Sequence, residues 1–310
     1  MIISASKRTD IPAFYSDWFF NRLQAGYVLI QNPRNPHMFS RVRLNPDVVD
    51  CIVFWTKNPY PMLAKLDKLQ PYDYYFQFTL TPYDQQVEAK LPSVKQRITI
   101  FKQLSEKIGK ERVIWRYDPI FISPEHSIEY HKQQFSYLLA ELKDYTQKCV
   151  ISFIDHYKHL HQTFNARAIK PMTNEQINEL AEYFAKQARQ AGIVLETCAE
   201  EVDLEQYGIA HGACINLQQI EQIIQSPINA KIDKNQREAC GCIESIDIGT
   251  YNTCLHECIY CYAITRQNQV IINRRQHDKL SPKLIGQIEP TDIIIDKMVS
   301  SVKTKQDSLF

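Results

Sequence analysis

Residues 112–118 read Arg-Val-Ile-Trp-Arg-Tyr-Asp, a short apolar run that ends in charged side chains. The run is apolar on both faces, which is typical of a parallel strand that lies between layers of helices. Its charged end predicts a functional position, because the active sites of parallel α/β barrels lie at the carboxyl ends of the strands. The same unit, an apolar strand with a polar end, recurs along the chain.

Seven segments have this strand character, and helical segments lie between most of them. The candidate strands are Met1–Ala5, Cys51–Trp55, Tyr74–Leu80, Arg112–Arg116, Cys149–Ile154, Ile193–Thr197 and Ser245–Gly249. A helix is predicted from the capping residue Ser93 to Gly109. Another follows the capping box of Thr173 and Gln176. This alternation of strands and helices predicts an α/β fold with a parallel sheet.

Two observations favour a barrel over a doubly wound fold. No Gly-x-Gly-x-x-Gly motif follows a candidate strand, which argues against dinucleotide binding of the Rossmann type. Polar side chains also gather after the strands, as at residues 6–10, 56–58, 116–118 and 155–156. We therefore predict a full or partial parallel (β/α) barrel over residues 1–265, which includes the cysteine loop 254–261. A helical tail is expected over residues 266–310.

The composition describes a chain that can bury a substantial core. It has 310 residues, 44% of them hydrophobic, and a formal net charge of +1. This charge gives no global field that would favour nucleic acid or an anionic membrane. No apolar stretch approaches the roughly 20 residues of a membrane-spanning helix, and no targeting signal is visible. We expect a cytoplasmic protein with no membrane partner.

Nine cysteines are the most informative residues of the sequence. An odd number in a chain without a visible signal peptide argues for metal binding or thiol chemistry and against a secreted disulfide framework. Cys51 and Cys149 begin apolar runs, where a small core residue is expected. The other seven lie between residues 198 and 261, which indicates a shared role.

Three of these cysteines lie in one short loop, Cys254-Leu-His-Glu-Cys258-Ile-Tyr-Cys261. Thiolates at spacings of four and three can converge on one small centre. A cubane iron–sulfur cluster and a structural zinc each usually take four ligands, so three local cysteines predict a 4Fe–4S cluster with one open iron. Zinc is the alternative, although zinc sites normally combine two distant pairs of ligands.

This loop resembles the signature of radical S-adenosylmethionine (radical SAM) enzymes, which is Cys-x3-Cys-x2-Cys with an aromatic residue before the last cysteine. Residues 260–263, Tyr-Cys-Tyr-Ala, are similar to the spore photoproduct lyase branch. The segments 55–58 (Trp-Thr-Lys-Asn) and 115–119 (Trp-Arg-Tyr-Asp-Pro) are similar to that branch as well. Together with Ser-Lys-Arg-Thr-Asp-Ile-Pro at 6–12, the whole pattern resembles a bacterial family known only as a domain of unknown function.

The resemblance implies that the three loop cysteines bind a 4Fe–4S cluster and that Tyr260 lies against the adenine of S-adenosylmethionine. One electron from the cluster would cleave this cofactor to methionine and a 5′-deoxyadenosyl radical. An electron donor is then implied, either a reductase or a protein of the flavodoxin or ferredoxin type. The substrate is open. Nucleic acid is a candidate that the net charge does not support.

The sequence departs from the radical SAM pattern in two ways. The cysteine loop follows the last candidate strand, whereas in that superfamily it follows the first. The resemblance therefore implies a circularly permuted barrel, in which residues 245–249 supply the usual first strand and residues 1–5 the next. The usual glycine-rich motif after the second strand is absent, and residues 4–10 (Ser-Ala-Ser-Lys-Arg-Thr-Asp) take its place.

Four charged residues at strand ends are further candidates for cofactor binding: Arg116, Lys57, Arg8 and Asp10. A guanidinium such as that of Arg116 suits a carboxylate, for instance the methionine tail of the cofactor. An internal ion pair with Asp118 is the alternative for this arginine.

Four cysteines outside the loop, Cys198, Cys214, Cys240 and Cys242, equal the ligand number of a second 4Fe–4S cluster or of a structural zinc. Buried thiols without a ligand are the third interpretation. For the whole chain, the leading hypothesis is a radical SAM enzyme without an assigned catalytic residue. The alternatives are a non-catalytic iron–sulfur electron-transfer protein and a zinc-stabilised binding module.

Overall fold

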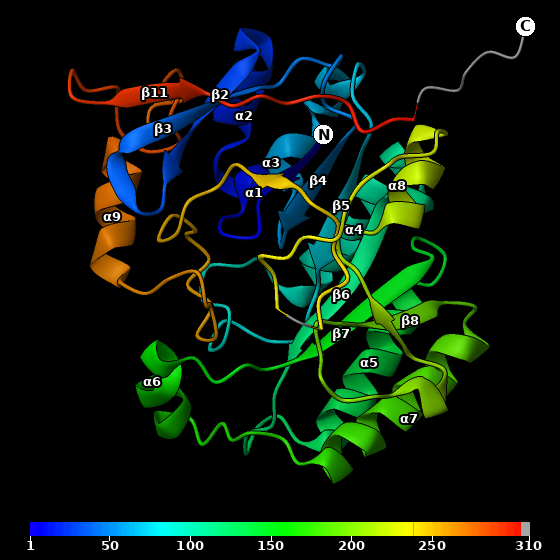
Figure 1. Cartoon of the computed structure of the whole chain (residues 1–310). Coiled ribbons are helices and arrows are strands. Elements are labelled where there is room, and N and C mark those ends of the chain that lie inside the picture. Colours follow the sequence, from blue (N-terminus) through cyan, green and yellow to red (C-terminus); the bar gives the residue numbers. More distant parts are fainter. Residues whose placement is uncertain (238, 305–310) are drawn as a thin grey trace, which may run out of the picture.

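The computed structural model describes residues 1–237 and 239–304. Its main feature is an eight-stranded sheet in the order β10-β1-β4-β5-β6-β7-β8-β9 (Figure 1). All neighbouring strands are parallel. The strands are β1 (Ile2–Ala5), β4 (Cys51–Thr56), β5 (Tyr74–Thr79), β6 (Val113–Ile120), β7 (Lys148–Phe153), β8 (Val194–Cys198), β9 (Ala210–Gly212) and β10 (Ile246–Asp247).

The predicted α/β fold with a parallel sheet is confirmed, and each of the candidate strands corresponds to a strand of this sheet. The short strand β9 was not predicted. Strands β10 and β9 form the two edges of the sheet and are not paired with each other in the described part of the chain. The sheet is therefore not closed by hydrogen bonds into a complete barrel.

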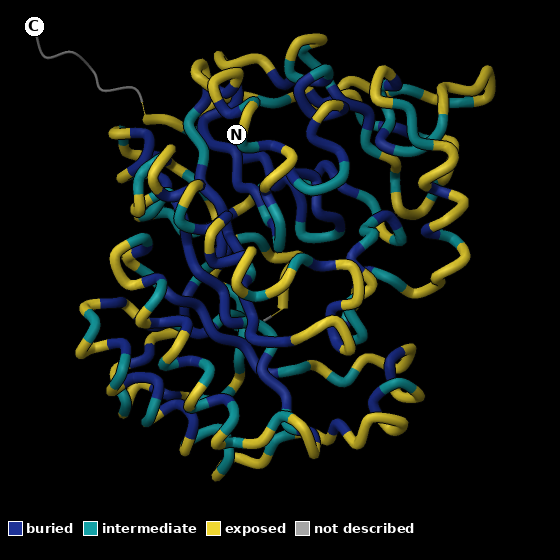
Figure 2. The backbone as a smooth tube through the Cα atoms, turned by 180° about the vertical axis from the view of Figure 1, so that it is seen from behind, coloured by how far each residue is buried: buried dark blue, intermediate teal, exposed yellow. Residues whose placement is uncertain are grey.

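Side chains along β6 illustrate how the two faces of the sheet differ. Val113, Trp115 and Tyr117 belong to the largest apolar cluster, which also contains the helix residues Phe101 and Phe135. Ile114 points to the opposite face and belongs to a second, smaller cluster. Figure 2 shows the sheet as the buried interior, with exposed segments around it.

The second face is apolar where the strands begin and polar where they end. Its apolar part contains Ile2, Val53, Ile114 and Val150, and helix α8 (Leu217–Ile224) packs on it through three isoleucines. Two residues further along the strands, the same face carries Gln77, Arg116 and other polar side chains. The alternation of the sequence thus builds a core at one end of this face and a polar site at the other.

Long helices cover the first face, and their ends follow the predicted capping signals. They are α4 (Val94–Ile108), α5 (Ile128–Leu142) and α7 (Asn174–Gln190). The predicted cap at Ser93 and the predicted capping box at Thr173 are both present, and Gln96 makes the Ser93 cap a capping box as well. The remaining helices are α1 (Ile11–Phe14), α2 (Ser16–Ala25), α3 (Tyr60–Leu63), α6 (His161–Ala166) and α9 (Gln267–Gln276), with the short 3₁₀ turns η1 (Leu66–Leu69), η2 (Lys110–Arg112), η3 (Lys158–Leu160) and η4 (Glu205–Tyr207).

The expectation of a helical tail over residues 266–310 needs correction. Helix α9 is present, but Ile293–Asp296 form strand β11, which pairs parallel with β3 (Asn35–Arg43). A hairpin partner, β2 (Tyr27–Asn32), completes a three-stranded sheet. The run Ile-Ile-Ile-Asp suits a strand, and the free edge of β3 supplies its hydrogen bonds. Residues 305–310 lie outside the described part of the tail.

Strands β10 and β1 lie side by side although they come from distant parts of the chain. Ile3 pairs with Ile246 and Ser4 with Asp247, and Figure 1 shows the yellow strand β10 beside the N-terminus. The sequence predicted this adjacency, and the pairing confirms it. The loop after β1 and the cysteine loop after β10 therefore leave the sheet next to each other.

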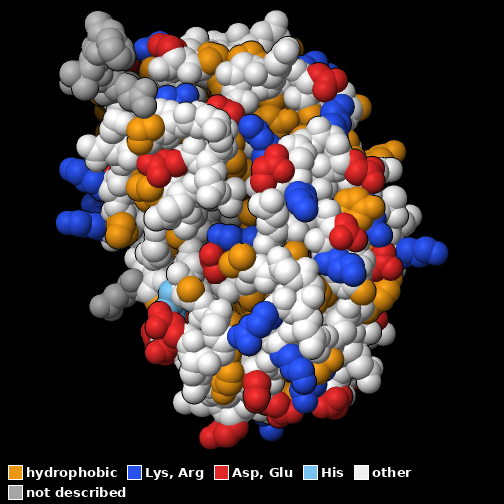
Figure 3. All heavy atoms as spheres, turned by 90° about the vertical axis from the view of Figure 1, so that its right-hand side faces the viewer, with side chains coloured by type: hydrophobic (Ala, Val, Ile, Leu, Met, Phe, Trp, Pro, Cys, Tyr) orange, Lys and Arg blue, Asp and Glu red, His pale blue; other side chains and the backbone are white. Residues whose placement is uncertain are grey.

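No helix among the described residues is both long enough and apolar enough to cross a bilayer. On the face drawn in Figure 3, acidic and basic side chains are interspersed and form no large area of one sign. This mixture agrees with the small net charge of the sequence.

Candidate functional site

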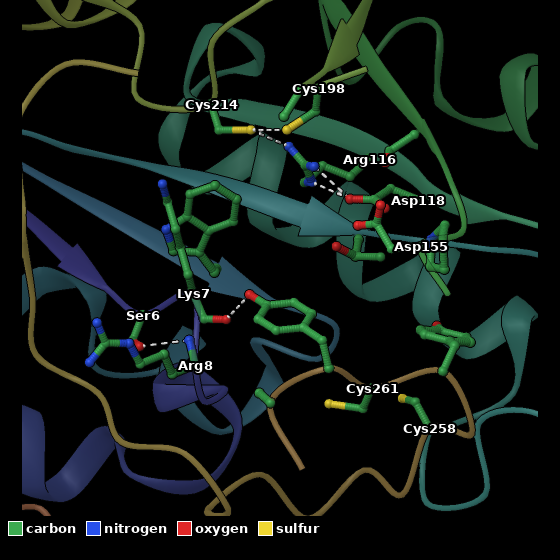
Figure 4. Close-up of a pocket in the computed structure, with 18 of the residues that line it drawn as sticks. Ser6, Lys7, Arg8, Arg116, Asp118, Asp155, Cys198, Cys214, Cys258 and Cys261 are labelled. Atoms are coloured by element: carbon green, nitrogen blue, oxygen red, sulfur yellow. Dashed lines mark hydrogen bonds and ion pairs between the residues drawn. The ribbon is translucent and has the colours of Figure 1, made fainter. Parts of the chain in front are cut away.

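A cavity of about 570 Å³ lies at the carboxyl ends of the parallel strands. Every residue that the sequence proposed for a metal or cofactor lines it: Cys254, Cys258, Cys261, Cys198, Cys214, Cys240, Cys242, Tyr260, Arg116, Lys57, Arg8 and Asp10. These side chains come from both ends of the chain and from its middle. The fold thus gathers the candidates into one place, and Figure 4 shows Cys258 and Cys261 on one side and Cys198 and Cys214 on the other.

The junction of β10 and β1 fixes the floor of the cavity. The Asp247 carboxylate accepts hydrogen bonds from Ser4 Oγ at 3.0 Å, Ser6 Oγ at 2.7 Å and the Lys7 amide at 2.8 Å. Gly249 follows closely, and a Cβ atom there would lie 2.0 Å from Ser6 Oγ. The chain can leave β10 towards the cysteine loop along this path because residue 249 has no side chain.

The cysteine loop is held on two sides. His256 is buried, and its Nε2 lies 2.8 Å from Asp10 Oδ2. On the other side, main-chain hydrogen bonds tie the loop to residues 87–90: the Ile259 amide donates to Val87 at 3.0 Å, and the Lys90 amide donates to the His256 carbonyl at 3.0 Å. The loop that carries three cysteines is therefore a fixed part of the structure.

Asp10 supports this loop and offers no free carboxylate oxygen to a cofactor. Its Oδ1 accepts the Ala13 amide at 3.0 Å and so caps α1. Its Oδ2 accepts the Lys57 amide at 2.7 Å as well as the contact from His256. The sequence placed Asp10 correctly at the site, but its observed partners give it a positioning role.

Lys57 belongs to a buried network whose centre, Glu88, was missed from the sequence. Lys57 Nζ lies 3.0 Å from Glu88 Oε1 and 2.8 Å from the Tyr260 hydroxyl. Arg97 Nη1 lies 2.8 Å from the other Glu88 oxygen. Burial alone would raise the pKa of Glu88, but Lys57 and Arg97 hold that pKa at about 2. Glu88 is therefore an ionised group that fixes a lysine and a tyrosine beside the cysteine loop.

Tyr260 is a wall of the cavity beside this network. Its hydroxyl donates to Glu88. Its ring packs near Tyr83 and Phe121, with ring centroids 6.1 Å and 6.3 Å away. Burial raises the pKa of the Tyr260 hydroxyl well above its ordinary value. The ring is consequently rigid, neutral and anchored at its polar end.

Arg116 makes the internal contacts that were the alternative for it. Its Nε and Nη2 donate to Asp118 Oδ2 at 3.1 Å and 2.5 Å. Its Nη1 donates to Cys214 Sγ at 2.8 Å. The guanidinium is buried and directed at a sulfur, so its place is with the second group of cysteines rather than with a cofactor carboxylate.

The side chains of the neighbouring cations Arg8 and Lys7 point to different parts of the cavity. The Arg8 guanidinium lies 5.2 Å from the ring centroid of Tyr251, an exposed residue at the mouth of the cavity. Lys7 Nζ lies 3.9 Å from Cys242 Sγ and 5.4 Å from the centroid of the Trp55 ring. The sequence singled out Arg8 for cofactor binding, whereas Lys7 is the residue that reaches a cysteine.

The four cysteines outside the loop meet on the inner face of the sheet. Cys198 Sγ and Cys214 Sγ are 2.9 Å apart (Figure 4). Cys214 is also in contact with Cys242, and Cys242 with Cys240. The Ile215 amide donates to Cys242 Sγ at 3.4 Å. These four sulfurs therefore form one continuous group.

The thiols are free, and their arrangement is not that of a mononuclear metal site. Cysteines in the described residues form no disulfide. Among these residues, no group of three or more histidine, cysteine, aspartate or glutamate side chains is arranged to hold one metal ion. The cysteine ligands of a cubane bind different irons and stand farther apart than ligands of one ion, so this finding concerns single ions.

Three buried polar atoms of residues that line the cavity lack a hydrogen-bond partner within the described residues. They are Thr9 Oγ1, Trp55 Nε1 and His256 Nδ1. A buried polar group without a partner costs about 1–3 kcal/mol. Several of them around one cavity indicate a polar ligand that completes their hydrogen bonds.

Comparison with known proteins identifies the family and nothing more. A family model described as "Domain of unknown function (DUF1848)" matches residues 2–263. Comparison with curated proteins gives no match, and comparison with solved structures gives none. The match covers the main sheet, the cavity and the cysteine loop, so the chain belongs to the DUF1848 family.

Proposed function

We propose that this member of the DUF1848 family is a radical SAM enzyme that cleaves S-adenosylmethionine at a 4Fe–4S cluster bound by Cys254, Cys258 and Cys261. One observation carries the proposal. The candidates chosen from the sequence for cluster and cofactor binding are far apart along the chain, yet they line a single cavity. Chance clustering of unrelated surface residues would not bring them together at the carboxyl ends of a parallel sheet.

The sheet order supports a circularly permuted partial barrel. Strand β10, which precedes the cysteine loop, pairs parallel with β1. Strands β4 to β8 then follow in chain order. If the order is counted from β10, the cysteine loop follows the first strand of the sheet, as in the superfamily that its motif resembles. The break between β9 and β10 makes this barrel a partial one.

The donor set fits a cluster with one iron left open. Three free thiols lie in one loop and line the cavity, whereas the histidine of the loop, His256, is held by Asp10 through its Nε2. Burial raises the pKa of the Cys254 and Cys258 thiols. Metal binding displaces those protons and supplies the positive charge that compensates the buried thiolates.

When bound, such a cluster supplies the electron that converts S-adenosylmethionine to methionine and a 5′-deoxyadenosyl radical. The protein's own part is to hold and shield these groups. Asp10 and Glu88 fix the loop from opposite sides. Tyr260 presents an anchored aromatic wall, and the cavity of about 570 Å³ suits a ligand of cofactor size. Trp55 Nε1 and Thr9 Oγ1 have no partner within the described residues, and both belong to residues that line this cavity.

The proposal is tested by anaerobic reconstitution, addition of dithionite and S-adenosylmethionine, and measurement of 5′-deoxyadenosine. We expect the product from the wild-type chain and none from Cys258→Ala. The matched control is Cys51→Ala, because Cys51 is a buried core cysteine outside the cavity. This variant should bind the same amount of iron as the wild type and form the same product.

Two outcomes would overturn the proposal. A wild-type chain that carries a complete cluster but forms no 5′-deoxyadenosine, with or without candidate substrates, would favour an iron–sulfur electron carrier. A chain that retains zinc and excludes iron under anaerobic conditions would favour the zinc-stabilised module. Equal product from Cys258→Ala and Cys51→Ala would also contradict the assignment of the cluster ligands.

A further inference from the structure

The four cysteines on the inner face of the sheet come from three separate segments. Cys198 ends β8, Cys214 follows β9, and Cys240 and Cys242 precede β10. Cys198 and Cys214 lie on the side of the cavity opposite Cys258 and Cys261 (Figure 4), and Cys240 and Cys242 line the same cavity. Nothing in the proposed reaction uses them.

The backbone around this group is built to hold it. The Cys214 carbonyl accepts hydrogen bonds from the Tyr75 hydroxyl at 2.7 Å and from Gln77 Nε2 at 2.8 Å, and both donors are buried. The Ile243 amide donates to the Ile215 carbonyl at 3.1 Å, which ties the segment of Cys242 to that of Cys214. Two buried polar side chains and a main-chain bond are therefore dedicated to positioning these cysteines.

Two cations point at the sulfurs. Arg116 Nη1 donates to Cys214 Sγ at 2.8 Å, and Lys7 Nζ lies 3.9 Å from Cys242 Sγ. Lys7 Nζ also lies 3.5 Å from the Gln236 amide oxygen, and no salt bridge joins it to a carboxylate within the described residues. Lys7 is half-buried, so a negative charge on the neighbouring sulfurs would meet a positive charge that water screens only in part.

From this arrangement we propose that Cys198, Cys214, Cys240 and Cys242 bind a second metal centre, an iron–sulfur cluster with a full set of cysteine ligands. Four thiolates around a dipositive core leave two negative charges, which Lys7 and Arg116 are placed to balance. A disulfide between Cys198 and Cys214 would instead leave Cys240, Cys242 and Lys7 without a role. Because all its ligands are cysteines, this centre would serve electron transfer or structure rather than cofactor cleavage.

The test isolates the second centre from the first. In the variant Cys254→Ala/Cys258→Ala/Cys261→Ala, anaerobic reconstitution should leave about four iron and four sulfide per chain, against about eight of each in the wild type. Adding Cys240→Ser to this variant should remove the remaining iron. Adding Cys51→Ala instead should leave it in place. Circular dichroism and the unfolding temperature of each variant separate loss of metal from loss of fold.

A second measurement uses the unaltered chain. Electron paramagnetic resonance of the reduced wild type should contain two cluster signals, of which S-adenosylmethionine changes one. Iron near four per chain with a single signal, both unaffected by Cys240→Ser, would overturn the proposal. Stoichiometric zinc lost on Cys240→Ser, or equal iron in the Cys240→Ser and Cys51→Ala backgrounds, would overturn it as well. None of these outcomes depends on 5′-deoxyadenosine, so a failure here is distinct from a failure of the proposed function.

Discussion

Cys254, Cys258 and Cys261 lie in one loop, whereas Cys198, Cys214, Cys240 and Cys242 reach the opposite side of the cavity from three segments. The loop can be recognised from its spacing alone because the local sequence places its sulfurs. The second group exists only after the sheet has formed, since β8, β9 and the approach to β10 must first come together.

The residues that contact the two groups of cysteines differ in charge. The loop rests on anions, Asp10 and Glu88, which hold its histidine and its tyrosine. The second group faces cations, Arg116 and Lys7. Carboxylates fix the backbone on one side, and positive charge meets the sulfurs directly on the other. The comparison teaches that neighbouring charges fix the position of the loop, whereas in the second group they compensate the charge of the sulfurs.

The largest effect should come from Glu88→Gln, which leaves Lys57 and Arg97 without their buried counter-ion. Removal of one partner from a buried ion pair typically costs about 3–5 kcal/mol. We expect a loss of about 3 kcal/mol in the free energy of unfolding, measured by denaturant titration of the metal-free chain. The control is Glu141→Gln, whose partner Lys102 lies at the surface and whose loss should cost at most about 1 kcal/mol. Equal losses would show that the network is not a main support of the loop.

A pair of glycines, one beside each group of cysteines, sharpens the comparison. A Cβ at Gly249 would lie 2.0 Å from Ser6 Oγ and 2.5 Å from Ser6 Cβ, whereas a Cβ at Gly241 would have its nearest neighbour at 3.5 Å. Overpacking of this kind costs about 1–3 kcal/mol. Gly249→Ala should therefore lower the free energy of unfolding by about 2 kcal/mol, and Gly241→Ala should leave it nearly unchanged. If both variants unfold like the wild type, the junction of β10 and β1 is softer than its geometry indicates.

A buried histidine, His131, predicts an effect of pH on stability. His131 is buried between the Tyr117 hydroxyl and the Phe121 carbonyl, and burial lowers its pKa from 6.5 to about 4. Below pH 6.5 the unfolded chain binds a proton that the folded chain refuses until about pH 4, so stability falls as the pH decreases through this window. Between pH 7.5 and pH 5 this histidine should account for ~2 kcal/mol.

The measurement compares denaturant unfolding of the wild type and of His131→Gln at both pH values. Glutamine keeps polar atoms at this position but does not titrate, so the variant should lose about 2 kcal/mol less than the wild type on acidification. The same loss in both chains would assign the pH dependence to other groups.

The smallest effect is expected from Asp10→Asn. Asparagine can still cap α1 through one oxygen, but its amide group then meets the Lys57 amide and His256 Nε2, which need an acceptor. Loss of a residue that hydrogen-bonds to the surroundings of a metal site typically lowers metal affinity 10- to 100-fold. Because this variant keeps the cap of α1, we expect a decrease near tenfold. We expect about tenfold faster loss of iron to a chelator, with Asp17→Asn, an exposed aspartate, as the control. No change in that rate would show that Asp10 acts on α1 alone.

Much of the fold could be predicted because the strands of the main sheet are continuous apolar runs with polar ends. Residues 113–117 show the limit of this reasoning, because the odd positions pack on helices and the even positions lie on the cavity side, yet both are apolar where the strand begins. The second sheet was missed since β3 reads Asn-Pro-His-Met-Phe-Ser-Arg-Val-Arg, half exposed and without an apolar run. The same reasoning mistook residues 293–296 for helix.

Within the site, the cysteines and the polar strand ends could be found because their spacing and position carry the information. Glu88 could not, since it lies in a loop of mixed composition and only the fold brings Lys57 and Arg97 to it. The hydrogen-bond partners of the Arg116 and Asp10 side chains could not be predicted from the sequence either. Both residues were placed at the cavity, but their partners Cys214 and His256 are 98 and 246 positions away.

The pairing of β1 with β10 has a consequence for how the protein is made. Synthesis begins with β1, but Asp247, the partner of Ser4, comes 243 positions later. The side of β1 that pairs with β10 therefore remains an unpaired sheet edge while most of the chain is produced. Contacts of such long sequence separation form slowly. The cavity is therefore completed last, and under the proposed function iron would bind in its final geometry only after the remainder of the domain has folded. We expect metal loading to act on a finished scaffold and not to guide its assembly.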